Sequence, residues 1–223
     1  MAKKIKVILL FGAPGCGKGT QGRMLGMLPG YVHLACGDVF RGIDQRSELG
    51  RIFSEYSTKG LLVPDEFTVR LWREHLNDMV ATGRFKPDRD VLVLDGIPRN
   101  MQQAKLLKPF MQVIRAVEIR TDRDPEQLVA RLRSRALKEG RADDAQEGII
   151  RRRLEVYEKE TTPVVGSYPK GIRAEVNGLQ SPMEVARDIV CGILGCMLPS
   201  EAGCRRTDAI WRGCPRSGGK KKA

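Results

Sequence analysis

A glycine-rich segment near the N-terminus constrains the fold of this chain more than any other feature. Residues 12–20 read GAPGCGKGT and follow an apolar, β-branched run over residues 5–11. A buried strand, a glycine-rich turn and an apolar-periodic helix in this order are typical of a phosphate-binding loop. Gly12, Gly15 and Gly17 let the backbone curl so that several N–H groups point inward at an anion. We therefore predict a nucleotide-phosphate site here.

The end of this segment supplies the groups that the phosphates need. The helix that follows places its positive end on the same anion. Lys18 is expected to reach the β- and γ-phosphates, and the Thr20 hydroxyl to take a phosphate oxygen or Mg²⁺. The usual pattern has Ser or Thr directly after the lysine, whereas Gly19 stands there in this chain. The ATP-binding residues predicted in the loop are Gly15, Cys16, Gly17, Lys18, Gly19 and Thr20.

Alternating strand and helix signals predict the fold class. Each expected strand is mainly apolar and does not alternate regularly between apolar and polar residues. This pattern is typical of strands buried on both faces of a parallel sheet. We predict an α/β fold of three layers, of the P-loop NTPase type, with helices on both faces of the sheet. The expected strands are residues 4–11, 31–34, 91–94, 113–120 and 172–176.

Capping residues predict where the helices begin. Pro64 and Asp65 precede a long periodic stretch, and residues 181–184 read SPME, which is a capping box. Asp143 and Asp144 predict a further helix start. Two polar segments, 35–63 and 135–143, are predicted insertions outside the core, and 199–223 is predicted to be a basic, disordered tail.

Composition excludes several classes of protein. No apolar run reaches the roughly 20 residues of a membrane span, and no signal-peptide hydrophobic region follows Met1, so we expect a cytoplasmic protein without a membrane partner. The six cysteines form no C-x-x-C pair, which argues against a disulfide framework and a zinc site. The net charge is +12, but aromatic residues are only 5% and do not alternate with basic ones. A nucleic-acid partner is therefore not expected.

Four further stretches narrow the function. They are residues 34–41 (LACGDVFR), 60–65 (GLLVPD), 95–99 (DGIPR) followed by Gln103, and 140–144 (GRADD). Guanidinium groups bind phosphate oxygens bidentately, and a carboxylate at the end of a buried parallel strand lies where open α/β sheets bind ligands. In this order and spacing the chain resembles the adenylate kinases, which belong to the nucleoside monophosphate kinases. The likeness covers about residues 5–194.

The resemblance implies reversible phosphoryl transfer from Mg-ATP to AMP, which gives two ADP, by a monomer. It implies a kinase domain over 1–198 with an AMP-binding insertion at 35–63 and a short lid at 135–143, without a metal site of its own. Such a transition state needs positioning and spread positive charge. The residues implied as catalytic are Lys18, Asp95, Arg99, Arg135, Arg141 and Arg153.

The resemblance also assigns the nucleotide contacts. Arg135 and the main chain of Gln180 are implied on the ATP side, and Asp95 is implied to orient the Mg²⁺ shell through water. The residues implied on the AMP side are Cys36, Arg41, Leu61, Leu62, Val63, Gly96, Ile97, Pro98, Arg99, Gln103, Arg141 and Arg153.

Two departures from the family pattern leave another acceptor open. Cys36 stands where adenylate kinases usually carry a Thr, and Asn100 after Arg99 is similar to the UMP/CMP kinases. Gln103 favours AMP, because a primary amide pairs with adenine bidentately, which is worth about 1–3 kcal/mol by analogy with groove readout. The alternatives are a UMP/CMP kinase and a non-catalytic nucleotide-binding module that acts through its basic tail.

Overall fold

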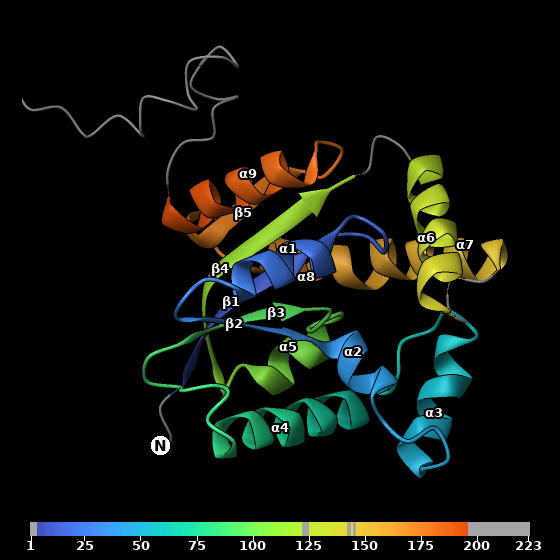
Figure 1. Cartoon of the computed structure of the whole chain (residues 1–223), viewed down its shortest axis with the longest axis horizontal. Coiled ribbons are helices and arrows are strands. Elements are labelled where there is room, and N and C mark those ends of the chain that lie inside the picture. The colour runs from blue at the N-terminus through green and yellow to red at the C-terminus, as the bar shows by residue number, and fades with distance from the viewer. Residues whose placement is uncertain (1–3, 122–124, 142–143, 145, 196–223) are drawn as a thin grey trace, which may run out of the picture.

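The chain folds around a parallel sheet, as the sequence predicts (Figure 1). The structure is a computed structural model and describes residues 4–121, 125–141, 144 and 146–195. Within them the sheet has five strands in the order β2-β3-β1-β4-β5. The strands are β1 (Ile5–Phe11), β2 (Tyr31–Ala35), β3 (Val91–Asp95), β4 (Met111–Arg120) and β5 (Arg173–Asn177). Every predicted strand is confirmed within two residues at each end.

Helices cover both faces of the sheet, which completes the three layers (Figure 1). The central strand β1 separates two apolar clusters, because its successive side chains point to opposite faces. Val7 and Leu9 pack with residues of α4, α5 and α8, while Ile8 and Leu10 pack with residues of α1 and α9. The helices are α1 (Lys18–Gly26), α2 (Cys36–Arg41), α3 (Glu48–Ser57), α4 (Asp65–Ala81), α5 (Met101–Leu107), α6 (Pro125–Glu139), α7 (Glu147–Val156), α8 (Thr162–Ser167) and α9 (Pro182–Leu194).

The helix starts agree with the capping signals, with one exception. Pro64 caps α4, and Ser181 and Glu184 form both hydrogen bonds of a capping box on α9. The prediction that Asp143 and Asp144 open a helix is wrong, because α7 begins at Glu147. The Asp144 carboxylate is instead buried between two arginines, as described below. Asp143 lies outside the described residues, as do residue 142 of the predicted lid and the whole predicted tail 199–223.

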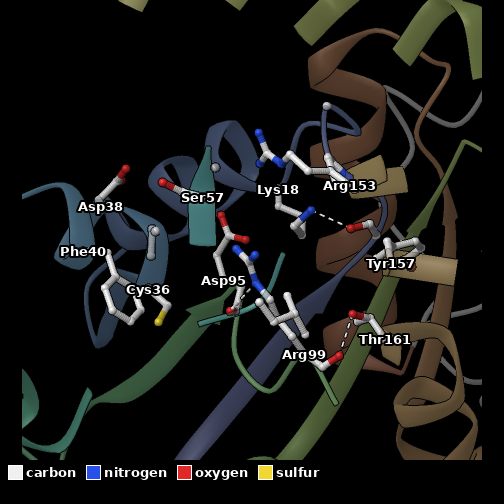
Figure 2. A pocket seen from close by; sticks show the side chains of 18 of the residues that line it. Lys18, Cys36, Asp38, Phe40, Ser57, Asp95, Arg99, Arg153, Tyr157 and Thr161 are labelled. Atoms are coloured by element: carbon white, nitrogen blue, oxygen red, sulfur yellow. Dashed lines mark hydrogen bonds between the residues drawn. The ribbon is translucent and has the colours of Figure 1, made fainter. Parts of the chain in front are cut away.

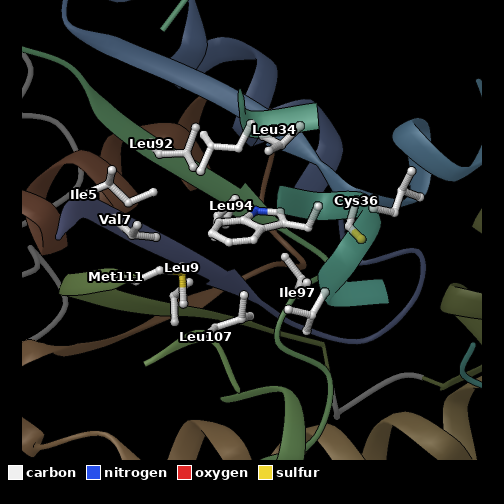
Figure 3. Packing of buried hydrophobic residues seen from close by; sticks show 14 of the residues in the cluster. Ile5, Val7, Leu9, Leu34, Cys36, Leu92, Leu94, Ile97, Leu107 and Met111 are labelled. Atoms are coloured by element: carbon white, nitrogen blue, oxygen red, sulfur yellow. The ribbon is translucent and has the colours of Figure 1, made fainter. Parts of the chain in front are cut away.

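The predicted insertion at 35–63 is more structured than its polarity indicates. It forms α2 and α3, and Cys36 and Phe40 are buried in the cluster that also contains Leu94 (Figure 3). The rings of Phe40 and Phe53 stack with centroids 5.1 Å apart, which joins the two helices. The segment therefore contributes to the core while it projects beyond the ends of β2 and β3.

No helix among the described residues combines the length and the apolar character that a membrane crossing requires.

The arrangement of the sheet positions a ligand site. β1 ends at the glycine-rich loop, β2 ends at α2, and β3 ends at Asp95. Open α/β sheets bind ligands outside the carboxyl ends of their strands, where successive connections diverge. In this chain α2, α3, α6 and α7 surround that edge of the sheet (Figure 1).

Candidate active site

A cleft of about 300 Å³ lies at the carboxyl ends of β1, β2 and β3, and Figure 2 shows part of its wall. Segments that are distant in the sequence line it: the loop 12–20, helix α2, residues 57–63, the turn after β3, and helices α6 and α7. This volume is at the lower end of the range for small-molecule sites. The predicted phosphate loop and the four predicted stretches thus meet in one place.

The loop 12–20 has the shape that an anion site needs. Gly12 has φ +143°, and a Cβ there would lie 2.5 Å from the carbonyl oxygen of Ile119, so only glycine fits. Helix α1 begins at Lys18, so its first N–H groups face the cleft. The Lys18 ammonium donates hydrogen bonds to the carbonyl oxygens of Gly12 (2.6 Å) and Ala13 (3.1 Å). A phosphate that binds here would replace the two carbonyl oxygens as the hydrogen-bond acceptor of the Lys18 ammonium.

Positive charge dominates the cleft. Among the described residues, its lining holds eight cationic side chains and three carboxylates, which are those of Asp38, Asp95 and Glu139. Such an excess at the walls of a concave site raises the local concentration of anionic substrates. The cationic residues are Lys18, Arg23, Arg41, Arg99, Arg131, Arg135, Arg141 and Arg153. The cleft therefore suits ligands with several negative charges.

Asp144 joins two of the predicted catalytic arginines. Its carboxylate has no exposed surface and accepts hydrogen bonds from Arg135 at 2.8 Å (Nε) and 2.5 Å (Nη2). The other oxygen accepts a hydrogen bond from Arg153 of α7. A buried carboxylate between two guanidinium groups fixes both of them relative to each other. Sequence analysis missed this role, because the three residues come together only when α6 and α7 pack.

Arginines from the lid and from the insertion share a second carboxylate. Arg41 of α2 pairs with Asp38, and the Arg141 guanidinium lies 4.0 Å from the same Asp38. Arg141 also donates to Glu139 at 2.6 Å. The lid and the insertion thus approach each other over the cleft, with their arginines on the cleft side.

Arg99 is held by hydrogen bonds along its whole length. Its Nε donates to the Gly96 carbonyl (2.9 Å), and its main-chain N–H donates to Oε1 of Gln103 (2.7 Å). The Arg99 carbonyl oxygen accepts a hydrogen bond from the Thr161 hydroxyl at 2.7 Å (Figure 2). Thr161 lies in a π-helical turn between α7 and α8. π-helical turns are frequent at functional sites. The Arg99 guanidinium is therefore preorganised in the cleft wall.

Cys36 and Tyr157 line the same cleft in protonated form. Burial raises the pKa of the Cys36 thiol to about 11, although the nearby Arg99 guanidinium lowers it. Burial likewise raises the pKa of the Tyr157 phenol. Neither group is an anion at neutral pH, so neither one offsets the positive charge that attracts anionic substrates to the cleft.

Three predicted contact residues do not line the cleft. Cys16 belongs to the phosphate loop but its side chain is buried, with the sulfur 3.7 Å from the Lys18 ammonium. Ile97 points into the core beside Leu94 (Figure 3). The Gln180 amide donates to Asp188 (2.8 Å) and to the Asn177 carbonyl (3.1 Å), away from the lining residues. The main-chain contact predicted for Gln180 stays a prediction.

Other predicted contact residues do line the cleft. Leu61, Leu62 and Val63 contribute one wall, and Gly96 and Pro98 contribute the turn beside Arg99. Their binding roles stay predictions.

The structure adds residues that sequence analysis did not select. Arg23 lines the cleft from α1, and its guanidinium would lie 3.7 Å from a Cβ on Gly19. The signal was available, because positions 19 and 23 are four apart and so share one face of a helix. Asn100, which left a pyrimidine acceptor open, does not line the cleft. Its side chain caps α5 and donates to Asp65 at 2.8 Å.

Comparison with known proteins identifies the family of the chain. The family model of adenylate kinase matches residues 10–172. The chain belongs to the adenylate kinase family. A protein named adenylate kinase from Kocuria rhizophila is 37% identical over 191 residues, which cover 83% of this chain and 97% of that protein. Proteins of the same name from Clavibacter michiganensis subsp. michiganensis (39% identical, 84% and 92% covered) and Maricaulis maris (37%, 83% and 97%) are similar to it.

The oxygen donors in the cleft of this family member fit magnesium that arrives with a nucleotide. Mg²⁺ is usually bound by one or two carboxylates together with substrate phosphates and water. Asp95 and Thr20 both line the cleft, and an Asp95 oxygen would lie 3.7 Å from a Cβ on Gly19, the residue before Thr20. Among the described residues, no three His, Cys, Asp or Glu side chains gather as a metal-binding group. One carboxylate and one hydroxyl beside the phosphate loop therefore fit a Mg²⁺ ion whose other ligands are phosphate oxygens and water.

Proposed function

We propose that this chain transfers the γ-phosphoryl group of Mg-ATP to AMP and yields two ADP. One observation carries the proposal: the glycine-rich loop and the guanidinium groups of α2, α6, α7 and the turn after β3 line a single cleft. The names of the relatives support it. Membership of the adenylate kinase family supports it as well.

Each part of the cleft has a role in this proposal. The ATP phosphates lie on the loop 12–20, where Lys18 leaves the Gly12 and Ala13 carbonyls for the β- and γ-phosphates. AMP lies between residues 36–63 and Gln103, with its phosphate on Arg41 and Arg99. Phosphoryl transfer passes through a loose transition state whose charge spreads over three equatorial oxygens. Arg135, Arg141 and Arg153 stabilise that charge, because preorganised cations need no reorganisation during the reaction.

Magnesium enters this proposal as part of the donor. When bound with the nucleotide, it would supply positive charge that offsets the charge developing during transfer. Thr20 and Asp95 are the residues that would hold and orient its coordination shell. The chain contributes the position of these oxygens beside the first turn of α1.

The lid closes over the nucleotides in this proposal. An open site would let water accept the γ-phosphoryl group, so the residues around Arg141 and Asp38 must exclude water before transfer. Opening of the lid then limits the release of ADP. In the structure the Arg141 guanidinium lies 4.0 Å from the Asp38 carboxylate, so the lid and the insertion already meet at these two residues.

Domain extent, oligomeric state and location belong to the same proposal. We assign one kinase domain to residues 1–198, with the insertion at 35–63 and the lid at 135–143. The extent is supported by the relatives, of which this chain covers 92–97%. We also propose that the chain acts as a monomer in the cytoplasm.

A substrate panel tests the proposed function. ADP formation is measured with Mg-ATP and, in turn, AMP, CMP and UMP, and AMP is expected to have the highest kcat/KM. Arg99→Ala should reduce kcat/KM for AMP by about 10³-fold, in the range of arginines at phosphoryl-transfer sites. Arg89→Ala is the matched control, because Arg89 is exposed just before β3, at the strand end opposite Asp95.

The outcomes of this panel separate the candidate functions. A faster reaction with CMP or UMP than with AMP would identify a pyrimidine acceptor. If no monophosphate yields ADP, or if Arg99→Ala behaves like Arg89→Ala, the proposed enzymatic function is wrong.

A further inference from the structure

A carboxylate behind the cleft wall binds a buried amide that lines the cleft. Asp65, the first residue of α4, does not line the cleft itself. Its Oδ1 accepts hydrogen bonds from Nε2 of Gln103 (2.9 Å) and from Nδ2 of Asn100 (2.8 Å). Gln103 is 1% exposed, so its amide has little access to water. The position of the Gln103 amide therefore depends on its protein partners.

The chemistry of these partners determines which way the amide points. An ionised carboxylate can only accept a hydrogen bond, and a main-chain N–H can only donate one. The Gln103 NH₂ group must therefore face Asp65, and its oxygen must face the Arg99 N–H, 2.7 Å away. The flipped amide would oppose oxygen to carboxylate and N–H to N–H. A buried site does not tolerate two such mismatches.

The amide then has one donor and one acceptor left for a ligand. A primary amide carries two N–H donors and two lone pairs on its oxygen. Asp65 uses one N–H and Arg99 uses one lone pair. One N–H on Nε2 and one lone pair on Oε1 are left, in a fixed order, on a residue that lines the cleft.

We propose that Asp65 is a specificity-determining positioning residue, which fixes the polarity of the Gln103 amide and thereby selects an acceptor base with an amino group beside a ring-nitrogen acceptor. The inference rests on the proposed function, in which Arg41 and Arg99 hold the acceptor phosphate and the base meets Gln103 in one orientation. Adenine offers an N6 amino donor beside the N1 acceptor. Hypoxanthine has nearly the same shape but offers an oxygen acceptor beside an N1–H donor, so the fixed amide opposes it at both positions.

The test compares AMP with inosine monophosphate as acceptors. Asp65→Asn keeps the shape of the side chain, but the new amide can donate a hydrogen bond as well as accept one. The Gln103 side-chain amide can then flip, so that its oxygen and its NH₂ group exchange places. Wild type should prefer AMP over inosine monophosphate by about 10³-fold or more in kcat/KM, as sites that hydrogen-bond their substrate do. In Asp65→Asn this ratio should fall at least about tenfold, with KM lower for inosine monophosphate and higher for AMP. The kcat for AMP should change little, because Asp65 does not line the cleft.

Two further variants separate specificity from folding. Asp65→Ser is the second test variant, because a hydroxyl also donates and accepts, and it serves if Asp65→Asn fails to fold. Glu66→Gln removes a neighbouring charge from the same first turn of α4, where Glu66 is exposed. It should leave the AMP preference at the wild-type value, since it has no bond to Gln103 in the structure.

Each outcome decides the matter. A reduced AMP preference in the Asp65 variants but not in Glu66→Gln supports the inference. If KM rises equally for both acceptors, Asp65 has only a structural role and the inference is wrong while the proposed function stands. If wild type forms no ADP from AMP, the proposed function fails and this inference fails with it.

Discussion

At the scale of single residues, Asp144 is the group on which the arginine arrangement depends. Asp144→Asn keeps its shape but removes the charge between Arg135 and Arg153. Loss of one partner from a buried ionic group should lower the free energy of unfolding by about 3 kcal/mol. Saturating Mg-ADP should reduce this deficit, since its phosphates would supply the missing negative charge. Chemical unfolding with and without Mg-ADP measures both effects.

An exposed site of the same composition provides the control for Asp144→Asn. Glu147 also pairs with two arginines, Arg133 and Arg151, and the hydrogen bond from Arg151 lowers its pKa. Because surface ion pairs contribute little, Glu147→Gln should change stability much less. Equal losses in both variants, or a loss in Asp144→Asn that Mg-ADP does not reduce, would contradict this account of the lid arginines.

At the scale of elements, contact between α1 and β2 decides the effect of a helix substitution. Gly22→Ala in α1 would gain up to about 1 kcal/mol in helix propensity. A Cβ there, however, would lie 2.2 Å from Nε2 of His33 in β2, and overpacking of this kind costs about 1–3 kcal/mol or more. We expect a net loss of stability in thermal unfolding. Gly148→Ala in α7, where a Cβ meets nothing within 4 Å, should be neutral or stabilising. A stabilised Gly22→Ala would show that the helix can move away from the strand.

Elements were predictable from the sequence where local pattern decides them. The strands follow continuous apolar runs, and Ser181 with Glu184 marks the start of α9, so both are confirmed. The start of α7 was not predictable, because the Asp144 carboxylate forms ion pairs with arginines of two helices and does not cap the N-terminus of either helix. Burial of Phe40 was missed for the same reason, since its partner Phe53 lies in the next helix.

At the scale of the whole molecule, the motifs predicted which segments meet but not how they hold each other. The phosphate loop and the carboxyl ends of β2 and β3 had to converge, because parallel strands end at one edge of a sheet. The hydrogen bond from the Thr161 hydroxyl to the Arg99 carbonyl, and those from Gln103 and Asn100 to Asp65, depend on packing between elements that are distant in the sequence. Spacing along the chain contains no information on such contacts, so these positioning groups appear only in three dimensions.

The excess of positive charge in the cleft predicts how salt affects the enzyme. In the part of the chain that the structure describes, eight cationic side chains and three carboxylates line it, and the whole chain has a net charge of +12. Raising KCl from about 0.1 M to about 1 M shortens the Debye length from about 10 Å to about 3 Å and screens this attraction. The kcat/KM for both nucleotides should fall, by about tenfold, and mainly through KM. The KM values of Mg-ATP and AMP should rise to a similar extent, because bound Mg²⁺ lowers the net charge of ATP to about that of AMP. Sucrose at matched osmolality should leave both KM values unchanged. If salt lowers kcat while both KM values stay constant, the field of the cleft does not attract the substrates, and its arginines act only after binding.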